Sequence, residues 1–220
     1  MLPAAVLWDM DGTLVDSEKL WDVSLAELVR RLGGELSAST RAAMVGGAME
    51  QTVRLAFGEV GRVPDAGAAR EAERFLTERT AELFAAGLPW RPGAPEALRA
   101  VRTTGVPTAL VTSTERALTE LALRSIGAHF FDVTVCGDEV ARPKPAPDPY
   151  RRAAELLGVD PARCVAVEDS PTGTAAAVAA GCTVLVVPSE VPVEPGERRV
   201  LRDSLVGVDA ALLAELLPGR

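Results

Sequence analysis

Short apolar runs alternate with amphipathic stretches along most of the chain. Five runs are almost wholly apolar, as strands buried on both faces of a parallel sheet are, and they cover residues 4–8, 107–111, 132–136, 163–167 and 183–187. Helical patterns, each followed by a glycine that favours the left-handed conformation beyond a helix end, cover residues 94–104, 115–126, 149–157 and 171–180. The alternation predicts an α/β fold, in which right-handed helical crossovers join the strands of a parallel sheet.

One segment, residues 16–88, interrupts this alternation because it contains helical patterns and no run typical of a strand. Apolar residues recur at helical spacing at Trp21, Leu25, Leu28 and Leu32, and again at Phe75, Leu76, Leu83 and Phe84. We expect a loop at 60–68 and an irregular surface connection at 187–199. The sequence thus predicts a Rossmann-like α/β core of residues 1–15 and 89–220, with an inserted α-helical cap of residues 16–88.

The composition is that of a globular protein and excludes several classes of function. Of the 220 residues, 48% are hydrophobic and 25% are charged. Because 31 acidic residues face 23 scattered basic ones, giving a net charge of −8, we expect no nucleic-acid partner. No apolar stretch approaches the roughly 20 residues of a membrane span, and the first residues lack the basic start of a secretory signal. Three cysteines in or beside apolar runs indicate reduced thiols, so we expect a cytoplasmic protein. We also expect the protein to be a monomer or a weak dimer.

Two residue types are scarce, and their positions limit the chemistry. The single histidine, His129, stands beside two phenylalanines and is expected to pack there, so Ser-His-Asp catalysis and histidine-rich zinc sites lack their residues. Lys19 and Lys144 are the only lysines among the 23 basic residues. A lysine retained in a chain that favours arginine suggests a role for a compact ammonium group.

Polar residues follow the carboxyl ends of the predicted strands, the edge at which parallel α/β sheets bind ligands. This group comprises Asp9, Asp11, Thr112, Ser113, Thr114, Lys144, Glu168 and Asp169. Carboxylates that converge repel one another unless a cation lies between them, and Mg²⁺ prefers oxygen ligands. We therefore predict a Mg²⁺ site with Asp9, Asp11 and Asp169 as its natural ligands.

A phosphoryl group is the second expected ligand of this edge. Thr112 and the main-chain N–H of Ser113, at a predicted helix start, can bind phosphate oxygens with help from the helix dipole. Lys144 adds a compact positive charge against the same oxygens. Once metal and lysine neutralise the phosphate, a carboxylate can attack phosphorus.

Each of these motifs also has a purely structural interpretation. The Asp-x-Asp-Gly run fits a turn capped by aspartate side chains, and Lys144 before a proline fits a solvated surface turn. Ser170 and Pro171 fit the N-cap and first position of a helix. These interpretations leave unexplained why all the motifs follow strands, so we favour catalysis.

Four motifs together resemble those of the haloacid dehalogenase superfamily. They are the run DMDGTLVDS from Asp9 to Ser17, then Thr112, then Lys144 with Pro145, and finally Glu168 with Asp169. The helical insert directly after the first motif resembles the β-phosphoglucomutase-like branch of that superfamily. The resemblance spans nearly the whole chain and implies the same α/β core with a helical cap.

The resemblance also implies a role for each motif residue. Asp9 would be the nucleophile that forms an aspartyl-phosphate, and Asp11 would protonate the leaving oxygen and then activate water. The main-chain carbonyl of Asp11 is the family's usual metal contact, which frees its side chain for proton transfer. Asp169 would bind Mg²⁺ directly, and Glu168 would act directly or through water.

The branch contains phosphatases and sugar phosphomutases, which differ in their caps. Mutases place a histidine and an arginine in the cap, and the corresponding positions here hold Trp21 and Met49. We therefore predict a Mg²⁺-dependent phosphatase that hydrolyses a small-molecule phosphate monoester whose far end is neutral or apolar. The alternatives are a mutase of the β-phosphoglucomutase type and, in another class, a non-catalytic member that binds phosphate or protein. A dehalogenase is disfavoured, because that chemistry needs no Mg²⁺.

Overall fold

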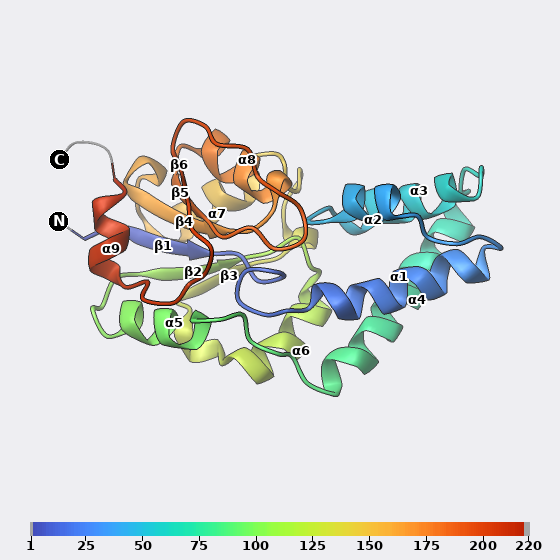
Figure 1. Cartoon of the computed structure of the whole chain (residues 1–220), viewed down its shortest axis with the longest axis horizontal. Helices are drawn as coiled ribbons and strands as arrows, with labels where there is room; N and C mark the ends of the chain where they lie inside the picture. The colour runs from blue at the N-terminus through green and yellow to red at the C-terminus, as the bar shows by residue number, and fades with distance from the viewer. Residues whose placement is uncertain (1, 218–220) are drawn as a thin grey trace.

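The computed structural model describes residues 2–217, in which a sheet flanked by helices is joined to a separate group of helices (Figure 1). The sheet is parallel throughout, as the alternation predicts, with the strand order β3-β2-β1-β4-β5-β6. Its strands are β1 (Ala5–Trp8), β2 (Thr108–Val111), β3 (Val133–Val135), β4 (Cys164–Glu168), β5 (Thr183–Val186) and β6 (Arg199–Leu201). Strand β1 pairs with β2 on one side and β4 on the other, so the loops after these three strands are neighbours.

Alternate residues of β1 face opposite layers of helices, as the two-residue period of a strand requires. Val6 and Trp8 pack into one hydrophobic core, and Ala5 and Leu7 pack into another. The first layer contains α5 (Ala94–Arg102), α6 (Arg116–Ile126) and α9 (Ala210–Glu215), and the second contains α7 (Asp148–Leu157) and α8 (Pro171–Ala180) (Figure 1). Short 3₁₀ turns are η1 (Ala128–Phe130), η2 (Gly137–Glu139) and η3 (Pro161–Arg163). With both faces covered, all of β1 is buried.

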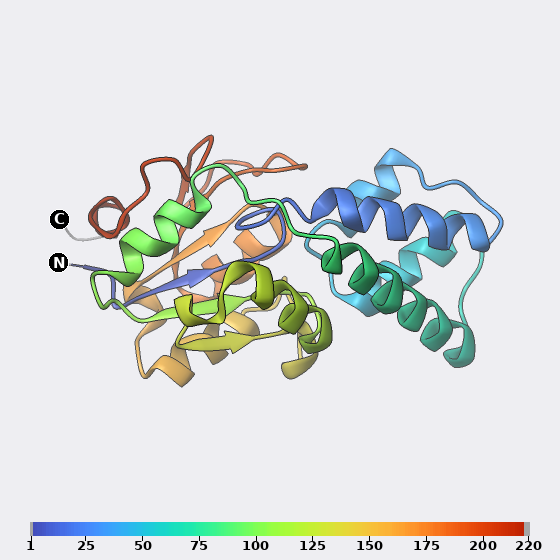
Figure 2. The ribbon, with the colours of Figure 1, turned by 90° about the horizontal axis from the view of Figure 1, so that it is seen from below.

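A helical unit lies beyond the carboxyl ends of the strands (Figure 2). It consists of α1 (Glu18–Arg31), α2 (Ala38–Met44), α3 (Met49–Glu59) and α4 (Ala66–Ala85). Its own hydrophobic core includes Leu25, Leu28, Val53, Phe57 and Leu76. Across residues 2–217, no helix combines the length and apolar composition needed to cross a membrane.

Two paired segments of chain connect the helical unit to the sheet. The N–H of Asp16 donates to the carbonyl of Pro89 at 2.8 Å, and the N–H of Arg91 donates to the carbonyl of Leu14 at 2.9 Å. The first of these segments is also the continuation of β1, so only residues 9–17 separate the end of the central strand from α1. Side chains of α1 are thereby held close to the loop that follows β1.

One local prediction is wrong at its end, and two short elements were not predicted. The loop expected at 60–68 ends at Asp65, whose carboxylate accepts two main-chain N–H groups and starts α4. The irregular connection expected at 187–199 is confirmed up to residue 198. Strand β6 follows it and was not predicted, because Val200 and Leu201 of this edge strand are 36% and 41% exposed and form no buried apolar run. Helix α9 was not expected, because its six residues are too few for a helical period to stand out.

Candidate active site

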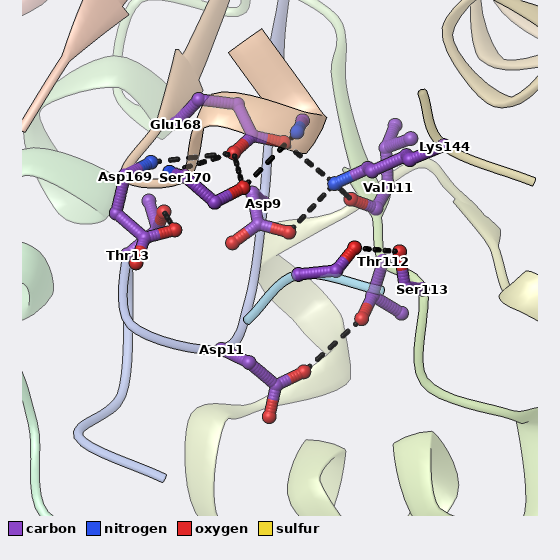
Figure 3. Close-up of polar contacts among 12 residues, drawn as sticks. Asp9, Asp11, Thr13, Val111, Thr112, Ser113, Lys144, Glu168, Asp169 and Ser170 are labelled. Carbon is purple, nitrogen blue, oxygen red and sulfur yellow. Dashed lines mark hydrogen bonds and ion pairs between the residues drawn. The ribbon is translucent and has the colours of Figure 1, made fainter. Parts of the chain in front are cut away.

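The loops after β1, β2 and β4 and the segment before α7 bring the predicted polar residues to one edge of the sheet (Figure 3). These residues are Asp9, Asp11, Thr112, Ser113, Lys144, Glu168 and Asp169. Gly12, in the loop after β1, has a φ of +81°, and a Cβ there would overlap the carboxylate of Asp169. Only glycine therefore allows this loop to lie so close to the end of β4.

The Lys144 ammonium lies at the centre of the site and is 3% exposed. It donates to Asp9 Oδ1 at 2.7 Å, to Glu168 Oε1 at 2.6 Å and to the main-chain carbonyl of Val111 at 2.9 Å. An ammonium has three N–H donors, so all of them are used. Burial alone lowers the pKa of Lys144, but the negative charges of Asp9 and Glu168 outweigh burial and raise it. Lys144 therefore stays charged and holds two buried carboxylates beside it.

Glu168 is saturated with hydrogen bonds at both carboxylate oxygens. Its Oε1 accepts from Lys144 and, at 2.5 Å, from the hydroxyl of Tyr150. Its Oε2 accepts from the main-chain N–H of Asp169 at 3.3 Å and from Ser170 Oγ at 3.2 Å. Glu168 thus holds both Lys144 and the start of α8 in place.

The acidic cluster of Asp9, Glu168 and Asp169 fits a divalent cation. One carboxylate oxygen of each residue lies within 4.8 Å of the others. Asp9 Oδ2 and Asp169 Oδ2 are buried, and neither has a hydrogen-bond partner among the residues that the structure describes. Thr13 Oγ1 donates to the other oxygen of Asp169 at 3.2 Å. Buried acceptors without donors are unfavourable, and a cation that prefers oxygen ligands would satisfy both of these.

The proximity of these carboxylates changes their acidity. Burial, followed by the charge of Glu168, raises the pKa of Asp9 from 3.8 to about 8, even though Lys144 opposes the shift. Burial, followed by the charges of Asp9 and Glu168, also raises the pKa of Asp169 well above its ordinary value. Without a cation, the acidic cluster therefore retains a proton near neutral pH.

Asp11 stands apart from the acidic cluster, and its carboxylate is held by four donors. Oδ1 accepts from Ser17 Oγ at 2.6 Å and from the indole N–H of Trp21 at 3.2 Å. Oδ2 accepts from Thr112 Oγ1 at 3.2 Å and from Thr114 Oγ1 at 2.8 Å. With its side chain held in this way, a metal contact of Asp11 would use its main-chain carbonyl.

Thr112 and Ser113, the residues predicted to bind phosphate, follow β2 directly. Thr112 Oγ1 accepts the N–H of Thr114 at 3.0 Å, which turns the chain before α6. Because of this turn α6 begins only at Arg116, so the prediction that Ser113 lies at the start of a helix is wrong. Ser113 Oγ donates to the main-chain carbonyl of Gly46 at 3.0 Å, a direct contact between the sheet edge and the helical unit.

A cavity of about 60 Å³ lies between the helical unit and the sheet edge, where Asp9 and Asp11 line it. Its apolar wall is formed by Trp21, Leu25, Met44, Val45 and Met49. The same wall contains Arg41, whose guanidinium pairs with both Glu18 and Asp22. One guanidinium that faces two carboxylates leaves no uncompensated positive charge at this end of the cavity.

Several residues of the site cannot be predicted from sequence patterns. Tyr150 belongs to no motif and reaches Glu168 only because α7 packs across the sheet. Arg41 lies on α2, a helix without a strong apolar period, and meets Glu18 from another helix. The sequence marks Trp21 as part of an apolar helix face and as the counterpart of a mutase histidine, and neither feature predicts its hydrogen bond to Asp11.

Comparison with known proteins matches residues 3–181 to a family model described as haloacid dehalogenase-like hydrolase. Hexitol phosphatase A of Escherichia coli (strain K12) is 34% identical over 188 residues, covering 84% of this chain and 84% of that protein. A plasmid phosphoglycolate phosphatase of Cupriavidus necator is 33% identical over 228 residues, covering 98% and 94%. The crystal structure of CbbY from Rhodobacter sphaeroides with phosphate superimposes with a TM-score of 0.84 at 30% identity, covering 97% of this chain and 100% of that one.

We expect a divalent cation to displace about one proton when it binds at pH 7, because a cation needs ionised ligands and the pKa of Asp9 is about 8 without it. Calorimetric titration with Mg²⁺ in two buffers of different ionisation enthalpy measures the number of protons released. The release should decrease as the pH rises through the pKa of Asp9, and Asp9→Asn should release less at pH 7. Equal heats in both buffers at pH 7 would contradict the raised pKa.

Tyr150→Phe should lower the free energy of unfolding by about 1–3 kcal/mol, because the buried carboxylate of Glu168 loses a donor while the ring packing stays. Urea unfolding followed by circular dichroism measures the change. An unchanged midpoint with an unchanged slope would show that this hydrogen bond contributes nothing to stability.

Proposed function

Because the chain belongs to the haloacid dehalogenase-like hydrolase family and is a phosphatase of small phosphate esters, we propose that Asp9 is its nucleophile and Mg²⁺ its metal. The predicted superfamily and the phosphatase activity are confirmed by these relatives. The β-phosphoglucomutase-like branch is confirmed by a putative β-phosphoglucomutase from Thermotoga maritima, which is 27% identical with a TM-score of 0.69. The observation that carries the proposal is the pair of buried, unpartnered oxygens on Asp9 and Asp169 beside a saturated Lys144 ammonium.

We infer that Mg²⁺ is held by Asp9 Oδ2, Asp169 Oδ2 and the main-chain carbonyl of Asp11. The free oxygens of Asp9 and Asp169 support this assignment, and the saturated oxygens of Glu168 favour an indirect role for that residue. When bound, Mg²⁺ supplies positive charge that neutralises the phosphate oxygens and keeps the carboxylates ionised.

In the proposed reaction Asp9 attacks phosphorus. A bond forms between a carboxylate oxygen of Asp9 and phosphorus while the ester P–O bond breaks, giving an aspartyl-phosphate. Asp11 donates a proton to the leaving oxygen and later accepts one from the water that hydrolyses the intermediate. Thr112 and the main-chain N–H of Ser113 would bind the non-bridging oxygens, and Lys144, whose three N–H groups are already engaged, would add its positive charge. The ammonium of Lys144 at 2.7 Å supports the ionised form of Asp9 that the attack requires.

We further propose that residues 16–88 act as a cap that closes this site. The hydrogen bond from Ser113 to the carbonyl of Gly46 brings the α2–α3 loop onto the sheet edge. Gly46 has a φ of +67°, and a Cβ there would lie 2.7 Å from Ser170 Oγ, so the fit is close on a second side. Such closure would limit the access of water to the aspartyl-phosphate.

We propose a substrate whose far end is neutral. The apolar wall of the cavity fits its carbon skeleton, and the hexitol phosphatase relative points to a polyhydroxyl compound. Arg41 is engaged by Glu18 and Asp22, so it offers hydrogen bonds but no free positive charge to a second phosphate. Trp21 and Met49 stand where mutases have a histidine and an arginine. These features favour a monophosphate of a polyhydroxyl compound over a bisphosphate, and hydrolysis over phosphoryl transfer between sugar positions.

We also propose that the protein is cytoplasmic. The three cysteines are free and buried, and burial raises the pKa of Cys136 and Cys164 to about 11 and that of Cys182 to about 12. Thiols of this kind suit the reducing cytoplasm. The net charge of −8 supports a small-molecule partner without nucleic acid, and we propose a monomer or a weak dimer.

Asp9→Asn should lower phosphate release from p-nitrophenyl phosphate by at least about 10³-fold, because an amide is a poor nucleophile of nearly the same shape. Phosphate release with Mg²⁺ measures activity, and circular dichroism checks that the fold is kept. The matched control is Asp203→Asn, an exposed carboxylate outside the site, which should retain wild-type turnover. Wild-type activity of Asp9→Asn would remove Asp9 as the nucleophile.

Substrate preference should depend on the neutralisation of Arg41. We expect kcat/KM for sorbitol 6-phosphate to exceed kcat/KM for fructose 1,6-bisphosphate. The double variant Glu18→Gln with Asp22→Asn frees the Arg41 guanidinium and should lower the ratio of these two constants about 10-fold. Adding Arg41→Met to the double variant should restore the original ratio. A ratio that is the same in all three proteins would show that these charges do not face the substrate.

A further inference from the structure

The carboxylate of Asp11 is bound by donors of two kinds. Ser17, Thr112 and Thr114 contribute hydroxyl groups, each of which can donate or accept a hydrogen bond. Trp21 contributes an indole N–H, which can only donate. An acid/base group must alternate between a neutral and an ionised form, and the hydroxyl groups can reverse their hydrogen bonds to suit either form. The indole cannot, so it constrains which oxygen of Asp11 carries the proton.

We propose that Trp21 is a positioning residue for the acid/base group, an inference that rests on the proposed role of Asp11. The indole N–H lies 3.2 Å from Oδ1 and keeps this oxygen an acceptor in both protonation states. The proton of neutral Asp11 then resides on Oδ2, beside Thr112 and Thr114. These two residues follow β2, on the sheet edge where Lys144 contacts Asp9, so the proton is placed on the side of the reacting phosphate.

The packing of Trp21 fixes the direction of its N–H. The residue lies on α1, and its ring meets the ring of Phe84 on α4 edge to face, with centroids 6.4 Å apart and planes at 85°. The ring also lines the cavity beside Asp11. An aromatic ring held in this way keeps its N–H directed at Oδ1.

The proton transfer balances in both half-reactions. As Asp9 bonds to phosphorus, the electron pair of the ester P–O bond passes to the leaving oxygen, which takes the proton from Asp11 Oδ2. Asp11 is then ionised, with Oδ1 still bound to Trp21. When water attacks phosphorus and releases Asp9, one proton of that water returns to Oδ2, which restores neutral Asp11.

Leaving-group dependence distinguishes this role from a structural one. The p-nitrophenolate group leaves without a proton, whereas the alkoxide of glycerol 2-phosphate needs the proton of Asp11. We expect Trp21→Phe to lower kcat/KM for glycerol 2-phosphate about 10-fold more than kcat/KM for p-nitrophenyl phosphate. General acid catalysis contributes roughly 10²–10⁴-fold to a rate, and misplacing the acid should lose only part of it. Equal losses for both substrates, or no loss for either, would show that Trp21 serves packing alone.

Two further variants test whether Trp21 acts through its hydrogen bond to Asp11. Phe84→Leu leaves the indole N–H but weakens the ring contact that directs it, so the ratio of the two substrates should change in the same direction as in Trp21→Phe, by a smaller factor. In Asp11→Asn, adding Trp21→Phe should not change the ratio further, because Trp21 acts through Asp11. A further loss there would overturn the inference. Continued turnover of p-nitrophenyl phosphate by Trp21→Phe shows that the proposed phosphatase itself is intact, so the test concerns Trp21 alone.

Discussion

The Lys144 ammonium is buried between Asp9, 2.7 Å away, and Glu168, 2.6 Å away, and it also binds the carbonyl at the end of β2. A buried ion pair is stable only while both charges and the remaining hydrogen-bonding groups have partners, and loss of one partner leaves an unpaired buried charge. Tyr150 supplies one of those partners to Glu168. Three strand ends and α7 are thereby tied to one group, and the geometry of the site depends on it.

Hydrogen bonding divides four neighbouring carboxylates into three kinds. Both carboxylate oxygens of Glu168 accept hydrogen bonds from other residues of the protein, so this residue holds its neighbours in place. The carboxylate of Asp11 accepts hydrogen bonds from three hydroxyl groups and one indole N–H. The hydroxyl groups can change from donor to acceptor, which suits a residue that gains and loses a proton. Asp9 and Asp169 each keep a buried oxygen without a partner, which suits a cation. Identical functional groups thus acquire different chemistry from their neighbours alone.

The helical unit contributes contacts that the sheet cannot make for itself. The loop at Gly46 meets Ser113 across the cavity, and Trp21 reaches Asp11 from α1. Arg41, engaged by two carboxylates of its own unit, defines the charge of the far wall. In the proposed mechanism, the sheet therefore arranges the chemistry at phosphorus, while the helices determine proton placement and substrate choice.

The sequence by itself determined the parallel α/β sheet, the inserted helices and the residues Asp9, Asp11, Lys144 and Asp169 as candidates for the site. Buried strands and capped helices are local patterns, and residues after strands share one edge by topology, so neither needs three-dimensional information. The sequence did not predict β6 or α9, because an exposed edge strand and a six-residue helix carry weak patterns. Only the tertiary structure decided that Glu168 is saturated, that Tyr150 and Trp21 complete the site and that Arg41 is neutralised. These outcomes depend on hydrogen bonds and ion pairs between groups on different elements, and such contacts follow from packing rather than from spacing along the chain.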